Sequence, residues 1–149
     1  MGTLTISSPS FKHQGDIPAK FTCDGADVNP ALAIGGVPAG TGSLALIVDD
    51  PDAPRGTWVH WVIWNIAPDM KELAEHSVPA GASQGMNDFR KLDYGGPCPP
   101  SGTHRYFFKL YALDTKLSIK GGAAKDALEK AMEGHILAKA ELVGLYKRK

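Results

Sequence analysis

The sequence predicts one mainly β domain, with one or two short helices near the C-terminus. Its 149 residues match the size of a single ordinary domain, which we place over residues 1–149. The 17 glycines and 11 prolines are spread between short apolar runs, a pattern typical of strands joined by turns. A helical pattern is clear only after about residue 120. These three observations favour a β-sheet protein over a helical or mixed parallel one.

Five apolar runs are the expected strands, and they cover residues 20–23, 31–34, 44–48, 57–66 and 104–113. The runs LALIV and TWVHWVIWNI are apolar on both faces, which indicates strands in the middle of a sheet that is covered on both sides. Residues 67–93 are mixed and polar, so we expect mostly loop and edge strand there. A helical turn is possible over residues 69–75.

The C-terminal part contains the expected helix and a last strand. Residues 123–134 place four apolar side chains on one stripe, namely Ala124, Leu128, Ala131 and Met132. On the other side, i,i+4 ion pairs are expected for Lys125–Glu129 and Asp126–Lys130, and Gly134 is suited to end the helix. Residues 138–148 contain helix-forming alanines but alternate like a strand, which we favour.

Charge and composition exclude several classes of partner. The 16 basic and 16 acidic residues give no broad electrostatic basis for binding nucleic acid or an anionic membrane. No signal peptide or membrane span is expected, so a cytoplasmic location is predicted. In that compartment Cys23 and Cys98 are expected to be reduced thiols, although a bridge between neighbouring loops stays open. Zinc-type cysteine spacing is absent, and no cofactor is predicted.

Three predicted strands carry polar side chains on faces that are otherwise apolar: Asp50 on the first, His60 on the second, and His104 with Tyr106 on the third. By strict alternation, His60 shares its face with Trp58, Val62 and Trp64. Each buried polar group without a partner costs on the order of 1–3 kcal/mol, so such groups are best gathered around one cavity. We expect Asp50 to bond one ring nitrogen of His60 and leave the other to a ligand.

A Gly- and Pro-rich segment, DYGGPCPPSGTHRY, leads into the third of these strands. Its glycines allow backbone to approach a ligand and its prolines stiffen the loop. The amides of Gly95, Gly96 and Cys98 are candidate donors to an anion. Together with the histidines and Tyr106 they predict a pocket for phosphate, sulfate or a carboxylate.

These motifs together resemble the signature of the phosphatidylethanolamine-binding protein family, also called the Raf kinase inhibitor protein family. The residues that carry the resemblance are DPDAP at 50–54, His60, GGPCPP at 95–100 and GTHRY at 102–106. The stretches FTCDG, YALD and GHILAKAEL are similar to the compact bacterial and archaeal branch. The resemblance extends over nearly the whole chain.

The resemblance implies a β-sandwich of two sheets with a small anion pocket near one edge. In the family this pocket binds phosphate-like anions, including the phosphorylethanolamine headgroup. Carried over by motif, the ligand-binding residues are Asp50, Trp58, His60, Gly96, Cys98, Pro99, His104 and Tyr106, and the loop 96–100 forms the rim. The resemblance also suggests a cis peptide bond before Pro54.

This chain differs from animal members of the family in two respects. Cys98 stands where those members have a glycine, which would place a thiol beside the pocket. We expect no counterpart of the extra C-terminal helix of animal members, so regulation of a kinase or protease is carried over only as analogy. Nothing in the sequence offers a groove for acyl chains.

The predicted function is therefore a non-catalytic binding or regulatory module for a small phosphate-like anion, with a homodimer as a plausible assembly. The alternatives are a protease inhibitor, a metal-dependent hydrolase built on Asp50, His60 and His104, and a hydrolase with Cys98 as nucleophile. A further alternative is that His60 is a core histidine bonded to Asp50, with no ligand. Asp52 is expected to hold its own turn, and Arg105 to pair with an acidic residue or stack on an aromatic ring on the opposite face of its strand.

Overall fold

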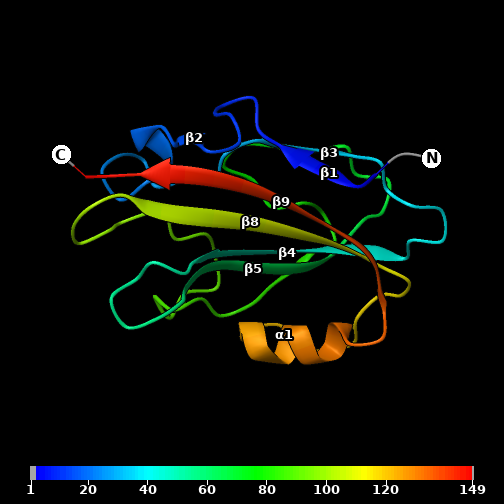
Figure 1. Ribbon diagram of the computed structural model, residues 1–149. Coiled ribbons are helices and arrows are strands. Elements are labelled where there is room, and N and C mark those ends of the chain that lie inside the picture. Colours follow the sequence, from blue (N-terminus) through cyan, green and yellow to red (C-terminus); the bar gives the residue numbers. More distant parts are fainter. Residues whose placement is uncertain (1–2, 149) are drawn as a thin grey trace.

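The computed structural model describes residues 3–148, which form two β-sheets and one α-helix (Figure 1). The small sheet has the strand order β1-β3-β6, with bounds Thr5–Ser7, Leu32–Gly35 and Glu72–Leu73. The large sheet has the order β2-β9-β8-β4-β5-β7, with bounds Gly15–Asp16, Ile136–Tyr146, His104–Leu113, Ser43–Asp50, Trp58–Ile66 and Ser83–Gln84. Helix α1 spans Lys125–Met132 and the 3-10 helix η1 spans Ala19–Phe21. The predicted mainly β fold with a helix near the C-terminus is confirmed.

The main core lies between the two sheets. The central strands β4 and β8 turn alternate apolar side chains toward the small sheet, among them Leu44, Leu46, Val48, Phe108 and Leu110, each at most 2% exposed. Because burial of each such side chain stabilises the fold by roughly 1.5–3 kcal/mol, this double row fixes the register of the two strands. Asp50 ends the β4 row, as its parity predicted.

Helix α1 covers the opposite face of the large sheet (Figure 1). Its Leu128 and Met132 are buried there, as the predicted stripe requires. On the same face Asp49 is buried and accepts hydrogen bonds from Lys109 Nζ at 3.1 Å and Lys125 Nζ at 2.8 Å. Lys125 therefore bonds the sheet, and the predicted pair with Glu129 does not form. The other predicted i,i+4 pair, Asp126–Lys130, is likewise not found among the residues described.

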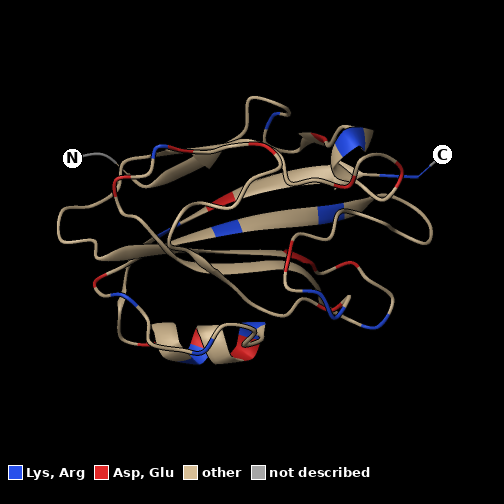
Figure 2. Ribbon diagram, turned by 180° about the vertical axis from the view of Figure 1, so that it is seen from behind, with Lys and Arg blue, Asp and Glu red and all other residues tan. Residues whose placement is uncertain are grey.

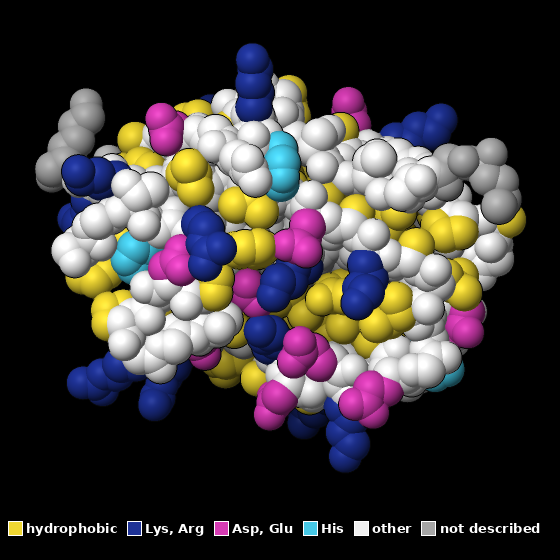
Figure 3. Space-filling model, in the orientation of Figure 1, with side chains coloured by type: hydrophobic (Ala, Val, Ile, Leu, Met, Phe, Trp, Pro, Cys, Tyr) yellow, Lys and Arg dark blue, Asp and Glu magenta, His cyan; other side chains and the backbone are white. Residues whose placement is uncertain are grey.

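The outer surface mixes charges of both signs. In Figure 2 the positions of basic and of acidic residues are interspersed along the loops, the strands and helix α1. Figure 3 shows apolar side chains gathered above α1, with charged groups of both signs around them. This interspersion agrees with the balanced composition. Among residues 3–148 no helix has the length and apolar character needed to cross a membrane.

Two predicted local structures are wrong. Residues 20–23 are not a strand, because the chain forms the short helix η1 and then a turn in which Thr22 Oγ1 bonds the carbonyl of Ala19 and accepts the N–H of Asp24. Local bonds of this kind compete with a sheet ladder. Residues 69–75 contain no helical turn, since strand β6 pairs there with β3.

The strand favoured for residues 138–148 is confirmed as β9, with bounds Ile136–Tyr146. It pairs with β8 from His104↔Tyr146 to Leu113↔Ile136, so the pairing runs along the whole of β8. Gly144 is required within β9, because a Cβ there would lie 2.5 Å from Ile17 Cγ1. Helix α1 falls inside the predicted span 123–134, and Gly134 takes a φ of 79° where the chain turns back.

A β-bulge in β5 changes which face His60 occupies. Asp49 pairs with Val59 and Val48 pairs with Trp61, which leaves His60 as the extra residue between them. As a result Trp61 lies in the core between the sheets, whereas Val59, Val62 and Trp64 lie under helix α1. The prediction that His60 shares a face with Val62 and Trp64 is therefore wrong, because alternation holds only in an unbroken strand. Bulges commonly redirect a side chain in this way near a functional site.

Cys23 and Cys98 form a disulfide, with Cα atoms 5.4 Å apart. The expectation of reduced thiols is wrong, because the fold brings the turn after η1 against the loop at 95–100. Beside the disulfide, the N–H of Cys23 donates to the carbonyl of Pro97 at 3.1 Å. The expected cis bond before Pro54 is also wrong, since residues 3–148 contain no cis peptide. The turn instead closes through a hydrogen bond from the N–H of Gly56 to the carbonyl of Ala53.

Candidate functional site

A cavity of about 250 Å³ lies at one end of the large sheet, where β4 ends, β5 begins and β8 begins. Its walls come from these strands, from the turn after Asp50 and from the loops at 87–100. The lining residues are Asp50, Ala53, Pro54, Trp58, His60, Phe89, Cys98, Pro99, Pro100 and His104. Six of the eight residues predicted for the pocket line it, and Tyr106 and Gly96 do not.

Asp50 holds His104 rather than His60. Its Oδ2 accepts a hydrogen bond from His104 Nδ1 at 2.6 Å, and its Oδ1 accepts the N–H of Asp52 at 2.8 Å. Both side chains of the pair are largely buried, with 4% and 9% exposure. The predicted bond from Asp50 to His60 is wrong, because the bulge turns the His60 ring toward a different acceptor. The pair fixes the His104 ring at the start of β8 with Nε2 left for a ligand.

His60 bonds a backbone carbonyl. Its Nδ1 lies 2.8 Å from the carbonyl oxygen of Gly95, which can only accept, so Nδ1 carries the hydrogen. The ring packs edge-on against Tyr106 at 5.2 Å and Phe89 at 5.3 Å between centroids. Burial lowers the pKa of His60 below its usual 6.5, and the Gly95 carbonyl and the Asp50 charge only partly oppose this. His60 is therefore neutral at pH 7.

Tyr106 forms the floor behind the two histidines. Its ring stacks beside His104 at 6.4 Å, and its side chain is 1% exposed. The hydroxyl is buried without a hydrogen-bond partner in the part of the chain described. Burial raises the pKa of Tyr106 above its usual range, and the nearby Asp50 carboxylate raises it further. The group is thus a neutral donor beside the cavity at every physiological pH.

Two of the three predicted amide donors are already used. The N–H of Gly95 donates to the carbonyl of His60 at 2.9 Å, and the N–H of Gly96 donates to Asp27 Oδ1 at 2.8 Å. Gly96 is needed for close packing, because a Cβ there would lie 2.4 Å from the carbonyl oxygen of Phe21. The prediction that both amides face an anion is therefore wrong. Cys98 has the one N–H of residues 97–100, and no hydrogen bond occupies it within residues 3–148.

The rim contains an aromatic pair, of which the sequence predicted only one member. Trp58 and Phe89 are 39% and 36% exposed and meet edge to face at 5.5 Å. Phe89 is positioned by Asn87, whose Oδ1 accepts the N–H of Phe89 and whose Nδ2 donates to the carbonyl of His60. Asn87 lies in the segment assigned to loop and edge strand. Its Asn-Asp-Phe sequence suggests a side-chain-bonded turn but gives no direction for the Phe89 ring.

Arg105 lies on the opposite face of β8 and pairs with Asp52, as expected for its parity. Asp52 Oδ2 accepts bonds from the backbone N–H and Nε of Arg105, both at 2.9 Å. The carboxylate thus ties the turn at 50–56 to β8, rather than only holding its own turn as predicted. The hydrogen bonds from Arg105 lower the pKa of Asp52 from 3.8 to about 2.

This pair predicts a dependence of stability on pH. Because the folded state lowers the pKa of Asp52, the stabilisation is complete above about pH 4 and is lost as the pH falls toward 2. Denaturant unfolding of wild type and Asp52→Asn at pH 6, 4 and 2.5 measures it. The difference in unfolding free energy should shrink below pH 4, and a difference that stays constant over this range contradicts the role assigned to Asp52.

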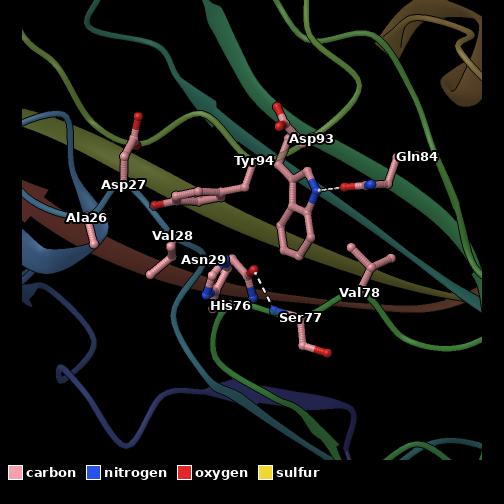
Figure 4. A pocket seen from close by; sticks show the side chains of 11 residues that line it. Ala26, Asp27, Val28, Asn29, His76, Ser77, Val78, Gln84, Asp93 and Tyr94 are labelled. Carbon is pink, nitrogen blue, oxygen red and sulfur yellow. Dashed lines mark hydrogen bonds between the residues drawn. The ribbon is translucent and has the colours of Figure 1, made fainter.

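A second cavity, of about 380 Å³, lies apart from these residues (Figure 4). The side chains around it include Asp27, His76, Asp93 and Tyr94. Much of its polar lining is already paired: Asn29 Oδ1 accepts the N–H of Ser77, and Trp61 Nε1 donates to Gln84 Oε1. None of the residues predicted for the anion pocket lines this cavity. We therefore assign the candidate site to the cavity at Asp50, His60 and His104.

The alternative chemistries receive little geometric support. Cys98 Sγ is bonded to Cys23 Sγ, so the cysteine nucleophile considered from the sequence is wrong for this structure. Within residues 3–148, no group of three His, Cys, Asp or Glu side chains has an arrangement that could hold a metal ion.

Comparison with known proteins identifies relatives across the length of the chain. The family model "Phosphatidylethanolamine-binding protein" matches residues 7–147. A UPF0098 protein of Methanothermobacter thermautotrophicus is 51% identical over 150 residues, which cover 97% of this chain and 99% of the relative. A UPF0098 protein of Pyrococcus horikoshii is 50% identical, with 99% of this chain and 78% of that protein covered.

Two solved structures have the same fold. A putative phosphatidylethanolamine-binding protein homologue from Chlamydia trachomatis superposes with a TM-score of 0.96 at 40% identity, and all of both chains is covered. Escherichia coli YbcL, described as a member of the mammalian family, gives a TM-score of 0.92 at 32% identity over 99% of this chain and 100% of that one. The sandwich of two sheets is therefore shared along the full length.

Proposed function

Because the chain belongs to the phosphatidylethanolamine-binding protein family, we propose that its cavity binds a small phosphate-like anion without chemical turnover. The ligand would be inorganic phosphate, the phosphorylethanolamine headgroup or a phosphorylated group on a partner protein. A cavity of about 250 Å³ suits such a group and leaves no room for acyl chains. A Raf kinase inhibitor-like role toward a kinase or protease, and a homodimer, are proposed by analogy with the family alone.

The observation that supports the proposal most directly is a pair of histidines at one cavity, each with one ring nitrogen free. His60 Nδ1 is fixed by the Gly95 carbonyl and His104 Nδ1 by Asp50, and no hydrogen bond to another residue of 3–148 occupies either Nε2. Two buried rings held at one cavity, each with an unused polar atom, are costly unless a ligand or water satisfies them. Cys98, whose N–H has no hydrogen bond within the described chain, also lines the cavity, and the Tyr106 hydroxyl lies behind it, close to Asp50 and to the Cys98 backbone.

The bonding of the two rings distinguishes this function from the alternative in which His60 is a core histidine without a ligand. A core histidine without a ligand would be expected to have both nitrogens satisfied by the protein. Here the protein satisfies one nitrogen of each ring, and both rings line the same cavity.

Titration calorimetry with inorganic phosphate and phosphorylethanolamine tests the proposal. We expect His60→Ala and His104→Ala each to weaken binding at least tenfold. The matched control is His135→Ala, because His135 also bonds an aspartate, Asp114, at 2.8 Å but lies on the surface. If the His135 variant loses affinity equally, or wild type binds neither probe, the cavity is not an anion site.

The disulfide bears on where the protein works. The cytoplasmic location is a proposal from the sequence, and disulfides are rare in the cytosol except in hyperthermophiles or in redox-active proteins. The Cys23–Cys98 bond therefore favours either an oxidising compartment or a hyperthermophilic cytosol.

A further inference from the structure

The cavity presents acceptors as well as donors. His60 Nδ1 must carry the ring hydrogen because it faces the Gly95 carbonyl oxygen. In a neutral imidazole the second nitrogen is then an acceptor, so His60 Nε2 offers a lone pair to the cavity. Asp50, which also lines the cavity, adds a carboxylate whose charge repels anions. A fully ionised anion would therefore meet two unfavourable groups.

The surroundings of His60 keep this lone pair free of a second proton. The titratable groups that act on the ring are Asp49 and Asp50 from β4 and Tyr106 from β8, with His104 on the same wall. The loop at 87–100 presents the Phe89 ring and the carbonyls of residues 95 and 96. The carbonyls and carboxylates favour the charged ring, but burial of a side chain that is 3% exposed outweighs them.

The cavity region also contains hydrogen-bond donors that a ligand could use. No hydrogen bond within residues 3–148 engages the Cys98 N–H, and the buried Tyr106 hydroxyl, which lies close to Asp50 and to the Cys98 backbone, is likewise without a hydrogen bond there. A ligand that fits must accept from these donors and give one hydrogen to His60 Nε2. Phosphate monoesters, whose second pKa is about 6, keep a proton at small cost near neutral pH. Sulfate esters have no proton to give.

We propose that the cavity selects oxyanions that carry an ionisable proton, such as a phosphate monoester monoanion, and discriminates against sulfate esters of the same charge. The P–O–H group donates to His60 Nε2, and the remaining oxygens accept from the donors around them. This inference rests on the proposed function, since it specifies the ligand of the same cavity. Above pH 6 it requires that binding takes up a proton from solvent, because the free ester is then mostly dianionic.

Methyl phosphate and methyl sulfate are matched probes. The methyl phosphate monoanion and methyl sulfate have the same charge and a closely similar tetrahedral shape; they differ in the central atom and in one acidic hydrogen, which only the phosphate ester carries. We would titrate both into wild type by calorimetry at pH 7.5, in two buffers of different ionisation enthalpy. The expected result is uptake of close to one proton per methyl phosphate bound, and binding of methyl sulfate at least tenfold weaker.

The outcomes separate this inference from the proposed function. If methyl sulfate binds as tightly as the methyl phosphate monoanion, once the affinity is corrected for the small monoanion fraction at pH 7.5, the selection is overturned while the anion site stands. If methyl phosphate binds without proton uptake, the proposal that the bound ligand carries a proton is overturned. If neither probe binds, the proposed function itself fails and the inference with it.

The variant His60→Gln tests the assigned group. The glutamine amide places an N–H donor near the position of the imidazole Nε2, so it can serve an anion without a proton. We expect the preference for methyl phosphate over methyl sulfate to fall from at least tenfold to near unity, and the proton uptake to disappear. An unchanged preference in a folded variant, checked by its amide spectrum, overturns the role of His60. Should the variant not fold, the wild-type comparison decides alone.

Discussion

Replacing both cysteines by alanine is expected to lower the free energy of unfolding by about 2–4 kcal/mol. The disulfide joins residues 75 positions apart, so it removes much of the freedom of the unfolded chain. In the folded state it ties the turn after η1 to the loop that supplies Cys98, Pro99 and Pro100 to the cavity. Denaturant unfolding of wild type and variant, without reductant, measures the loss.

The two single variants provide the control. Because either substitution removes the whole bond, Cys23→Ala and Cys98→Ala should each cost about as much as the double variant. If each single variant loses only part of the unfolding free energy, and the two losses add up to the loss in the double variant, the disulfide is contradicted. The disulfide would also be contradicted if the wild-type protein, denatured without reductant, showed two reactive thiols.

Replacing Asp50 by alanine is expected to cost about 3 kcal/mol of unfolding free energy. Asp50 is 3% exposed, and its removal leaves His104 Nδ1 and the N–H of Asp52 without their acceptor. A buried polar pair that loses one member is strongly destabilised, since the remaining member is desolvated but unpaired. Chemical unfolding at pH 7 measures the effect.

Asp52→Ala is the matched control for this variant. Asp52 lies two residues later and also bonds a β8 residue, but its side chain is 29% exposed and its partner Arg105 is 53% exposed. Exposed pairs contribute little, so Asp52→Ala should cost far less than Asp50→Ala. Equal losses from the two variants would contradict the assignment of Asp50 as the buried anchor of the site.

Much of the sheet could be predicted because its strands are continuous. The span 104–113 and its buried parity match β8, and the β9 strand follows from alternation. The partner of His60 could not be predicted, because the bulge between Val59 and Trp61 depends on pairing with β4. The segments at 19–23 and 87–98 take their form from contacts far apart in the chain, such as Asp27 with Gly96.

The candidate residues were easier to predict than their bonds. Motif order placed Asp50, His60 and His104 at one cavity, and the structure brings all three to its wall. Which carboxylate or carbonyl holds which ring depends on shifts of a few ångströms that sequence periodicity does not encode. For the same reason Phe89 was missed, since its position follows from the side-chain bonds of Asn87.

The most direct test of the anion site is an NMR titration of the five histidine imidazoles with inorganic phosphate and phosphorylethanolamine. We predict that the signals of His60 and His104 shift together and saturate, because both rings line one cavity. The signals of His13, His76 and His135 should stay in place. If His60 and His104 do not move while either anion is added, or if all five shift without saturation, the anion-binding account is contradicted.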